Sequence, residues 1–233
     1  MSRPPVTCYA CNEPKVSREH APPKCLFPEQ DDLPLGKNLR LNLIRVPSCD
    51  VHNLEKSTDD EFLMWVLSVQ SLGNQYRQLS FHTKAIRAFR ERPGSLLALL
   101  ENPTAVNLLA ADGRLLPSAS FEIDLLRFNR CMAQIGKALY FKETRKKWCS
   151  DCEVFSNLFH AMTGTGSHGL NERHQEAVAI AEKALAPLPR KGQNPEVFSY
   201  RFSAHRPDLI VLLMTYYEEI KVLVTLRVNL RAK

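Results

Sequence analysis

The chain carries CYAC at residues 8–11, EHAPPK at residues 19–24 and CDVHNLEK at residues 49–56. The first and third segments open with clips of equal spacing, Cys8-x-x-Cys11 and Cys49-x-x-His52. Tetrahedral zinc accepts three thiolates and one imidazole, and two short clips are the usual way in which a protein supplies them. We therefore expect these four residues to form a structural zinc site that fixes the fold of the N-terminal segment.

Cys25 lies between the two clips and is a competing ligand. If Cys25 replaced His52, the zinc would have four cysteine ligands and His52 would be free for another role. We favour His52, because its spacing from Cys49 repeats the spacing of the first clip. Cys149-x-x-Cys152 is a further pair, but no second clip of similar quality follows it. We expect these two cysteines to pack rather than to bind metal.

Composition excludes some classes of protein. The 233 residues suit one domain of moderate size or two small ones, and the ordinary hydrophobic content argues against extensive disorder. Because the N-terminus has no apolar signal core and no apolar run approaches the ~20 residues of a membrane span, we expect a cytoplasmic protein without membrane contact. The net charge of +6 is compatible with a nucleic-acid partner. Basic groups at residues 84–92 and 142–147 could extend such a surface, although solvated helix faces explain them as well.

The distribution of apolar residues predicts an α+β protein. Residues 39–46 alternate apolar and polar side chains, which favours a strand, and a short helix should start near Asp50. Patterns of helical period and runs of β-branched and aromatic residues indicate the later elements. The predicted helices cover residues 58–72, 76–91, 96–101, 121–148 and 171–185, and the predicted strands cover residues 197–202, 210–217 and 220–228.

Two further segments are less regular. Residues 102–118 indicate a loop or a short hairpin, and residues 149–162 indicate helix or turn. We expect a zinc module with its following helix over residues 1–74. Residues 75–233 should form an α+β companion domain of unknown role, with a helical middle region and a small C-terminal antiparallel sheet.

The order and spacing of the N-terminal segments resemble those of the HNH endonucleases, a branch of the ββα-metal nucleases. Zinc-stapled members combine a first clip, an acidic residue and His before a Pro-containing stretch, and a second clip followed by Asn and then Lys. This chain has CYAC, EHAPPK, CDVHN and LEK in that order, over about residues 8–60. The resemblance implies a zinc-bound ββα-metal module and metal-dependent hydrolysis of phosphodiester bonds in DNA. A role in defence or in a mobile element is implied by the same resemblance alone.

The resemblance also implies roles for individual residues. His20 matches the general base that takes a proton from the attacking water, which suits an imidazole because its pKa lies near neutral. Glu19 and Asn53 match the ligands of a catalytic Mg²⁺ or Mn²⁺ ion, separate from the structural zinc. Lys56 lies about one helical turn after Asn53, where its ammonium group can meet phosphate. Lys24 is the second expected nucleic-acid contact.

The chain departs from the family's pattern in two places. The glycine pair of the central segment is absent, and the Asn expected there is Asn38 or Asn42. We choose Asn42, which lies nearer the second clip, to orient His20. The fourth zinc ligand is His rather than Cys, and if His52 bound the catalytic cation instead, Asn53 would lose that role. The alternative function is a zinc module that binds nucleic acid or protein without cutting, with oligomerisation through the C-terminal region.

Overall fold

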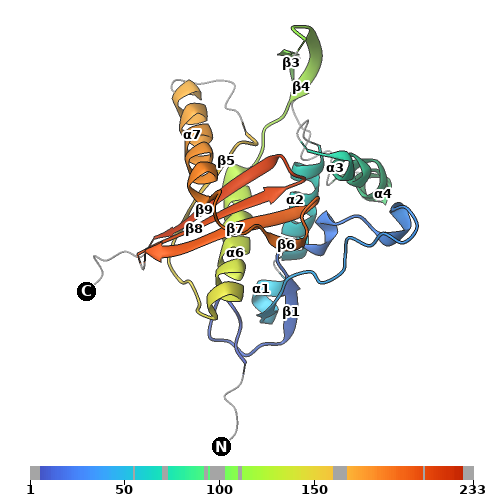
Figure 1. The fold of residues 1–233 in the computed structure, drawn as a ribbon. Coiled ribbons are helices and arrows are strands. Elements are labelled where there is room, and N and C mark those ends of the chain that lie inside the picture. Colours follow the sequence, from blue (N-terminus) through green and yellow to red (C-terminus); the bar gives the residue numbers. More distant parts are fainter. Residues whose placement is uncertain are drawn as a thin grey trace, which may run out of the picture.

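The computed structural model describes residues 6–54, 56–69, 73–91, 94, 103–109, 112–159, 167–206 and 208–227. The protein has a mixed α+β fold (Figure 1). A small antiparallel sheet from the C-terminal part of the chain lies between two long helices. The N-terminal segment lies beside one end of the first of these helices, away from the C-terminal helix.

The N-terminal segment forms a two-stranded ladder followed closely by a short helix. β1 (Ser17–His20) pairs antiparallel with β2 (Arg45–Ser48), so that Glu19 lies opposite Val46 and His20 opposite Arg45. α1 (Asp50–Leu54) begins directly after Cys49. Two short 3-10 helices, η1 (Lys24–Leu26) and η2 (Gln30–Asp32), lie in the loop between the strands. Of these elements, the residue pattern predicts a strand before the second clip and the short helix near Asp50, and it does not predict β1.

The strand expected over residues 39–46 begins only at Arg45. Residues 39–42 form turns, and Asn42 has a φ of +52°, a left-handed conformation that interrupts an extended chain. Leu39 is buried in the main core. The alternation of apolar and polar residues therefore comes from a turn anchored by a buried leucine and not from a strand.

α2 (Lys56–Ser68) is the helix on which the N-terminal segment rests. Residues 62–67 are all buried, so this part of the helix is covered on every side and not along one face alone. α2 packs against η1 and against α6 (Leu125–Thr144), the longest helix. The buried Asp59 of α2 accepts a hydrogen bond from Arg127 Nε of α6 at 2.7 Å and lies 3.5 Å from a guanidinium nitrogen of Arg130.

A continuous run of helix follows α2, and then a hairpin. The run consists of α3 (Gln75–Ser80), the π-helical turn η3 (Phe81–Ala85) and α4 (Ile86–Glu91). β3 (Thr104–Leu109) and β4 (Leu115–Ser120) form an antiparallel hairpin that projects from the body of the protein (Figure 1). Of the two readings of residues 102–118, the hairpin is therefore confirmed. The helix predicted over residues 96–101 lies outside the described residues.

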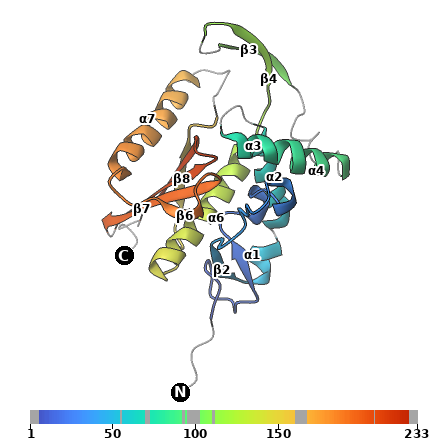
Figure 2. The same ribbon diagram turned by 45° about the vertical axis from the view of Figure 1, so that its right-hand side comes forward.

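The C-terminal sheet has five antiparallel strands in the order β5-β9-β8-β7-β6. Its strands are β5 (Cys152–Ser156), β6 (Lys191–Asn194), β7 (Phe198–Arg206), β8 (Leu209–Tyr216) and β9 (Ile220–Arg227). α6 covers one face of the sheet, and α7 (Ser167–Leu185) covers the other (Figure 2). Leu212 and Val224 belong to the core on the α6 side, and Leu213 and Leu223 pack with α7. The predicted hairpin of the last two strands is confirmed.

The expectation of helix or turn over residues 149–162 is wrong, because Cys152–Ser156 forms an edge strand on β9. Val154 packs with the core on the α6 side, whereas Phe155 packs on the α7 side. This alternation is the strand pattern, but over so few residues it is too short to be distinguished from a turn in the sequence.

One hydrophobic cluster extends from the N-terminal segment to the C-terminal sheet. It includes Leu26 of η1, Trp65 of α2, Met132 of α6 and Tyr216 of β8. The division of the chain near residue 74 stays a prediction, and the two parts share this core. Among the described residues, no helix has the length and apolar character needed to cross a membrane.

Substitution of two helical glycines by alanine should change the free energy of unfolding in opposite directions. A Cβ atom at Gly136 of α6 would lie 2.9 Å from Val224 Cγ1 of β9, whereas a Cβ atom at Gly169 of α7 would meet nothing within 4 Å. Overpacking should outweigh the helix-propensity gain in Gly136→Ala, which we expect to lower the free energy of unfolding by about 1–2 kcal/mol. Gly169→Ala should raise it by about 0.5 kcal/mol. Urea unfolding of both variants checks this, and a stabilised Gly136→Ala would contradict the close packing of α6 on the sheet.

The buried Lys84 should make the free energy of unfolding depend on pH. It is 7 % exposed in η3 and donates hydrogen bonds to the carbonyl oxygens of Cys25, at 2.9 Å, and of Phe27. Burial lowers the pKa of Lys84 from 10.5 to about 8. Between these two values the unfolded chain binds a proton that the folded protein does not, so the free energy of unfolding should rise with pH in this window, by about 1–3 kcal/mol.

The measurement is denaturant unfolding of the wild-type protein and of Lys84→Met between pH 7.5 and 10. The wild-type minus Lys84→Met difference isolates the lysine from the other titrating groups. We expect this difference to increase with pH. A flat difference would show that the ammonium group stays charged in the folded protein.

Candidate metal centre

One tight turn and one helical turn position the four predicted zinc ligands. Cys8 and Cys11 lie in a turn before β1, which is closed by hydrogen bonds from Cys8 N to Glu13 O and from Lys15 N to Val6 O. Cys49 follows β2 directly, and His52 lies one turn later on α1, where Asn53 N donates to Cys49 O. Pairing of β1 with β2 brings the two clips to the same place.

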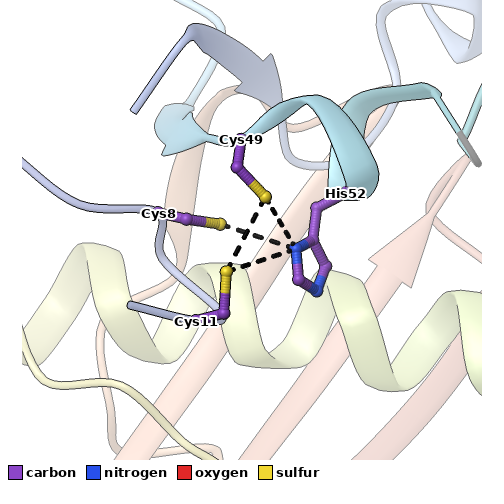
Figure 3. A group of neighbouring side chains, drawn as sticks. All are labelled: Cys8, Cys11, Cys49 and His52. Carbon is purple, nitrogen blue, oxygen red and sulfur yellow. Dashed lines mark hydrogen bonds between the residues drawn. The ribbon is translucent and has the colours of Figure 1, made fainter. Parts of the chain in front are cut away.

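The four side chains point toward one another (Figure 3). Their ligand atoms, three Sγ and His52 Nδ1, all lie within 4.8 Å of one another. The Cys11 Sγ–Cys49 Sγ, Cys8 Sγ–His52 Nδ1 and Cys11 Sγ–His52 Nδ1 distances are each 3.7 Å, and Cys49 Sγ–His52 Nδ1 is 3.1 Å. Zinc bonds of about 2.3 Å to sulfur and 2.0–2.1 Å to nitrogen, in a tetrahedron, imply separations of about 3.5–3.8 Å. The cluster therefore fits a metal such as zinc.

The two thiols of the first clip both have shifted pKa values. Burial raises the pKa of the Cys8 thiol, but hydrogen bonds from the backbone N–H groups of Ala10, Cys49 and Cys11 outweigh it and leave the pKa below its ordinary value. A thiol must lose its proton to bind a metal. In the same clip, burial raises the pKa of the Cys11 thiol to about 11, so the two thiols are shifted in opposite directions.

Cys25 is not a member of the cluster. Its Sγ donates a hydrogen bond to Asp60 O at 3.3 Å. Of the two ligand sets that the sequence leaves open, the structure brings together the one with His52. Cys149 is exposed and Cys152 lies in β5. Among the described residues, the N-terminal cluster is the one group of His, Cys, Asp or Glu side chains close enough together to hold a metal ion.

Glu19 lies beside the cluster on the inner face of the ladder, where it is 5 % exposed. Its Oε1 accepts a hydrogen bond from Tyr9 Oη at 3.3 Å, and its Oε2 accepts one from Ser48 Oγ at 3.2 Å. Burial and the neighbouring Glu19 carboxylate raise the pKa of Tyr9 well above its ordinary value, so the phenol stays a donor. The Tyr9 ring lies 6.2 Å from the His52 ring, centroid to centroid. Tyr9 and Ser48 therefore connect Glu19 to the residues that carry the metal ligands.

His20 follows Glu19 and belongs to the opposite, outer face of the ladder, because side chains alternate along a strand. It is half-buried. Asn53 is exposed on α1, and Lys24 is exposed in η1. Lys56 is the first residue of α2.

Asn42 lies in the turn that precedes β2 and is exposed. It lines a small pocket that also includes Ala21 and Pro22, the two residues after His20. The far side of this pocket is formed by residues 192–194 and Phe198 of the C-terminal sheet. Asn42 therefore lies in the same part of the surface as the segment that leaves His20, and its role in orienting His20 stays a prediction.

Sequence reasoning missed the residue that fastens the first clip to the rest of the protein. Lys147, just after α6, donates hydrogen bonds to Cys11 O at 2.6 Å, to Thr7 Oγ1 at 2.8 Å and to Asn12 Oδ1 at 3.1 Å. The sequence places Lys147 in a basic group that reads as a solvated helix face or a nucleic-acid surface. Its partners lie more than 130 residues away in sequence, and no local pattern indicates them.

Comparison with protein-family models, with curated proteins and with solved structures finds no match for this chain.

The two candidate ligand sets make different predictions for substitution. Cys49→Ser should lower the metal content from about one zinc per chain to near zero and unfold the N-terminal segment, because a zinc bound there would supply much of its stability. Cys25→Ser is the matched control and should keep the metal, because Cys25 lies outside the cluster and the serine hydroxyl can still donate a hydrogen bond to Asp60 O. Elemental analysis and thermal melting of both variants check this. Zinc retained by Cys49→Ser, or lost by Cys25→Ser, would show that the ligand set is wrong.

Proposed function

We propose that the protein is a metal-dependent endonuclease that hydrolyses phosphodiester bonds in DNA, with His20 as its general base. One observation carries the proposal: the four-residue metal-ligand cluster holds together the ladder that bears Glu19 and His20 and the helix that bears Asn53. The order of these elements is that of the ββα-metal nucleases, which the sequence resembles. In cells, the proposal places this activity in the cytoplasm, in defence or in a mobile element.

In the proposed mechanism His20 accepts a proton from the attacking water. Its place on the outer face of β1 leaves the imidazole partly accessible to a substrate laid against the ladder. Glu19 and Asn53 are the proposed ligands of a Mg²⁺ or Mn²⁺ ion, which would offset negative charge on the phosphate and the leaving oxygen. Tyr9 and Ser48 orient the Glu19 carboxylate through their hydrogen bonds, as neighbours of metal-ligating carboxylates commonly do.

The proposed zinc has a structural role. A site with four protein ligands has no open position for water or substrate, whereas catalytic zinc sites keep one. Cys8, Cys11, Cys49 and His52 would fill all four positions. Lys56 and Lys24 are proposed to contact phosphates, and Asn42 to orient His20.

The alternative function is a zinc module that binds nucleic acid or protein without cutting. One observation favours it: Glu19 is 5 % exposed and both of its oxygens accept hydrogen bonds, as expected of a carboxylate that stabilises the fold. Under this alternative the substitution of His20 changes no activity. The experiment that follows separates the two functions.

The test is cleavage of supercoiled plasmid DNA with Mg²⁺ or Mn²⁺. Wild-type protein should nick or linearise the plasmid, and His20→Ala should lower the rate by at least about 100-fold, since general bases contribute 10²–10⁴-fold. His82→Ala is the matched control, because His82 is an exposed histidine on η3, and it should cleave as the wild type does. Zinc content must be unchanged in both variants. Equal cleavage by wild type and His20→Ala would contradict the role of His20, and no cleavage by either would favour the alternative.

A further inference from the structure

The outer face of the β1–β2 ladder carries two arginines around His20. Side chains alternate along a strand, so Arg18 and His20 lie on the same face of β1. The register places Arg45 of β2 directly opposite His20, and Pro47 opposite Arg18. Both arginines are exposed. His20 therefore has one guanidinium group two residues before it on its own strand and a second one across the ladder.

The two faces of the ladder have different tasks. Glu19, Val46 and Ser48 form the inner face and are 5 %, 1 % and 0 % exposed. They pack toward Tyr9 and the metal cluster. Because the inner face supplies the packing, nothing in the ladder requires arginine on the outer face for folding.

The hydrogen-bond pattern of the ladder sets the distances between the side chains on its outer face. Ala21 N donates to Ile44 O across the ladder, and Pro47 O is directed away from β1 toward Tyr9 N. His20 and Arg45 are therefore a pair without hydrogen bonds between their own backbones, in which side chains approach most closely, with Cα atoms about 4.5 Å apart. Arg18 and Arg45 are diagonal neighbours, about 7–8 Å apart. Two like charges at this spacing repel each other unless an anion lies between them or beside them.

The positive charges of Arg18 and Arg45 are not neutralised by an acidic side chain in the described part of the protein. Neither guanidinium group forms an ion pair with a described residue. By contrast, Arg40 pairs with Glu29 at 3.2 Å, and Arg127 pairs with Asp59 at 2.7 Å. Guanidinium groups bind phosphate through two parallel hydrogen bonds, and they recognise nucleic-acid backbones for this reason.

We propose that Arg18 and Arg45 bind the backbone phosphates on either side of the phosphodiester group that is presented to His20. This inference rests on the proposed function, and it names the residues that hold the substrate at the same site. The two arginines are positioning residues for the nucleic-acid backbone and carry no base specificity. Together with His20 they define the outer face of the ladder as the nucleic-acid surface.

The test is binding of a fluorescent duplex DNA oligonucleotide by the full-length His20→Ala protein, so that cleavage does not interfere. Each of Arg18→Gln and Arg45→Gln, added to His20→Ala, should weaken binding about three- to tenfold at 0.1 M salt. Each should also lower the slope of log K against log salt by about one, the value for one lost phosphate contact. Arg45→Lys should keep most of the slope, because the charge remains. Arg173→Gln on α7, an exposed arginine on the far side of the sheet, is the matched control and should change nothing.

The outcomes separate this inference from the proposed function. If wild-type protein does not cleave DNA but both glutamine variants lose slope, the arginine surface is supported and the hydrolase is not. If wild-type protein cleaves DNA and both glutamine variants bind with unchanged affinity and slope, the inference is overturned while the hydrolase stands. Absence of measurable binding by the His20→Ala protein also overturns it, as does an equal loss of slope in Arg173→Gln.

Discussion

The N-terminal part of this protein depends on the convergence of Cys8, Cys11, Cys49 and His52. Its ladder has only four residues in each strand, and its helix has five residues. A two-stranded ladder of that size is marginal in water without further support. Structural zinc contributes an apparent ~10–16 kcal/mol in small zinc modules, which is far more than so short a ladder supplies. Metal ligation is thus the interaction that can fix the register, and the register places Glu19 inside and His20 outside.

Side chains from later parts of the chain also hold the N-terminal segment in place. Ala138 and Phe141 of α6 pack on the cluster. Lys147 donates hydrogen bonds to Cys11 O of the first clip and to the side chains of Thr7 and Asn12 on either side of it. In the loop between β1 and β2, the carbonyl oxygens of Cys25 and Phe27 accept hydrogen bonds from Lys84 of η3. α6 thus packs both on the C-terminal sheet and on the metal-ligand cluster. This arrangement couples the stability of the sheet to the geometry of the candidate site.

The clips could be found in the sequence because each is a local pattern, four residues long, whose chemistry allows few other uses. The helices α6 and α7 were likewise visible from their period. The elements that were missed depend on partners far away in the chain. β5 is defined by its pairing with β9, and Lys84 and Lys147 are buried or engaged by segments 57 to 140 residues away. The sequence around a lysine does not reveal a hydrogen-bond partner so far away in the chain. Both lysines therefore resemble solvated surface residues until the fold is known. The strand expected over residues 39–46 was misread for a related reason, since Asn42 adopts a left-handed conformation that no alternation of apolar residues indicates.

The most direct test of this account is X-ray absorption spectroscopy at the zinc edge, on the full-length protein as purified. We expect one zinc per chain with three sulfur ligands at about 2.3 Å and one nitrogen ligand at about 2.0–2.1 Å. The imidazole should also give its own multiple-scattering signal from His52. Four sulfur ligands, a shell of oxygen ligands, or protein that is fully folded without zinc would contradict the claim that these four residues hold the site together.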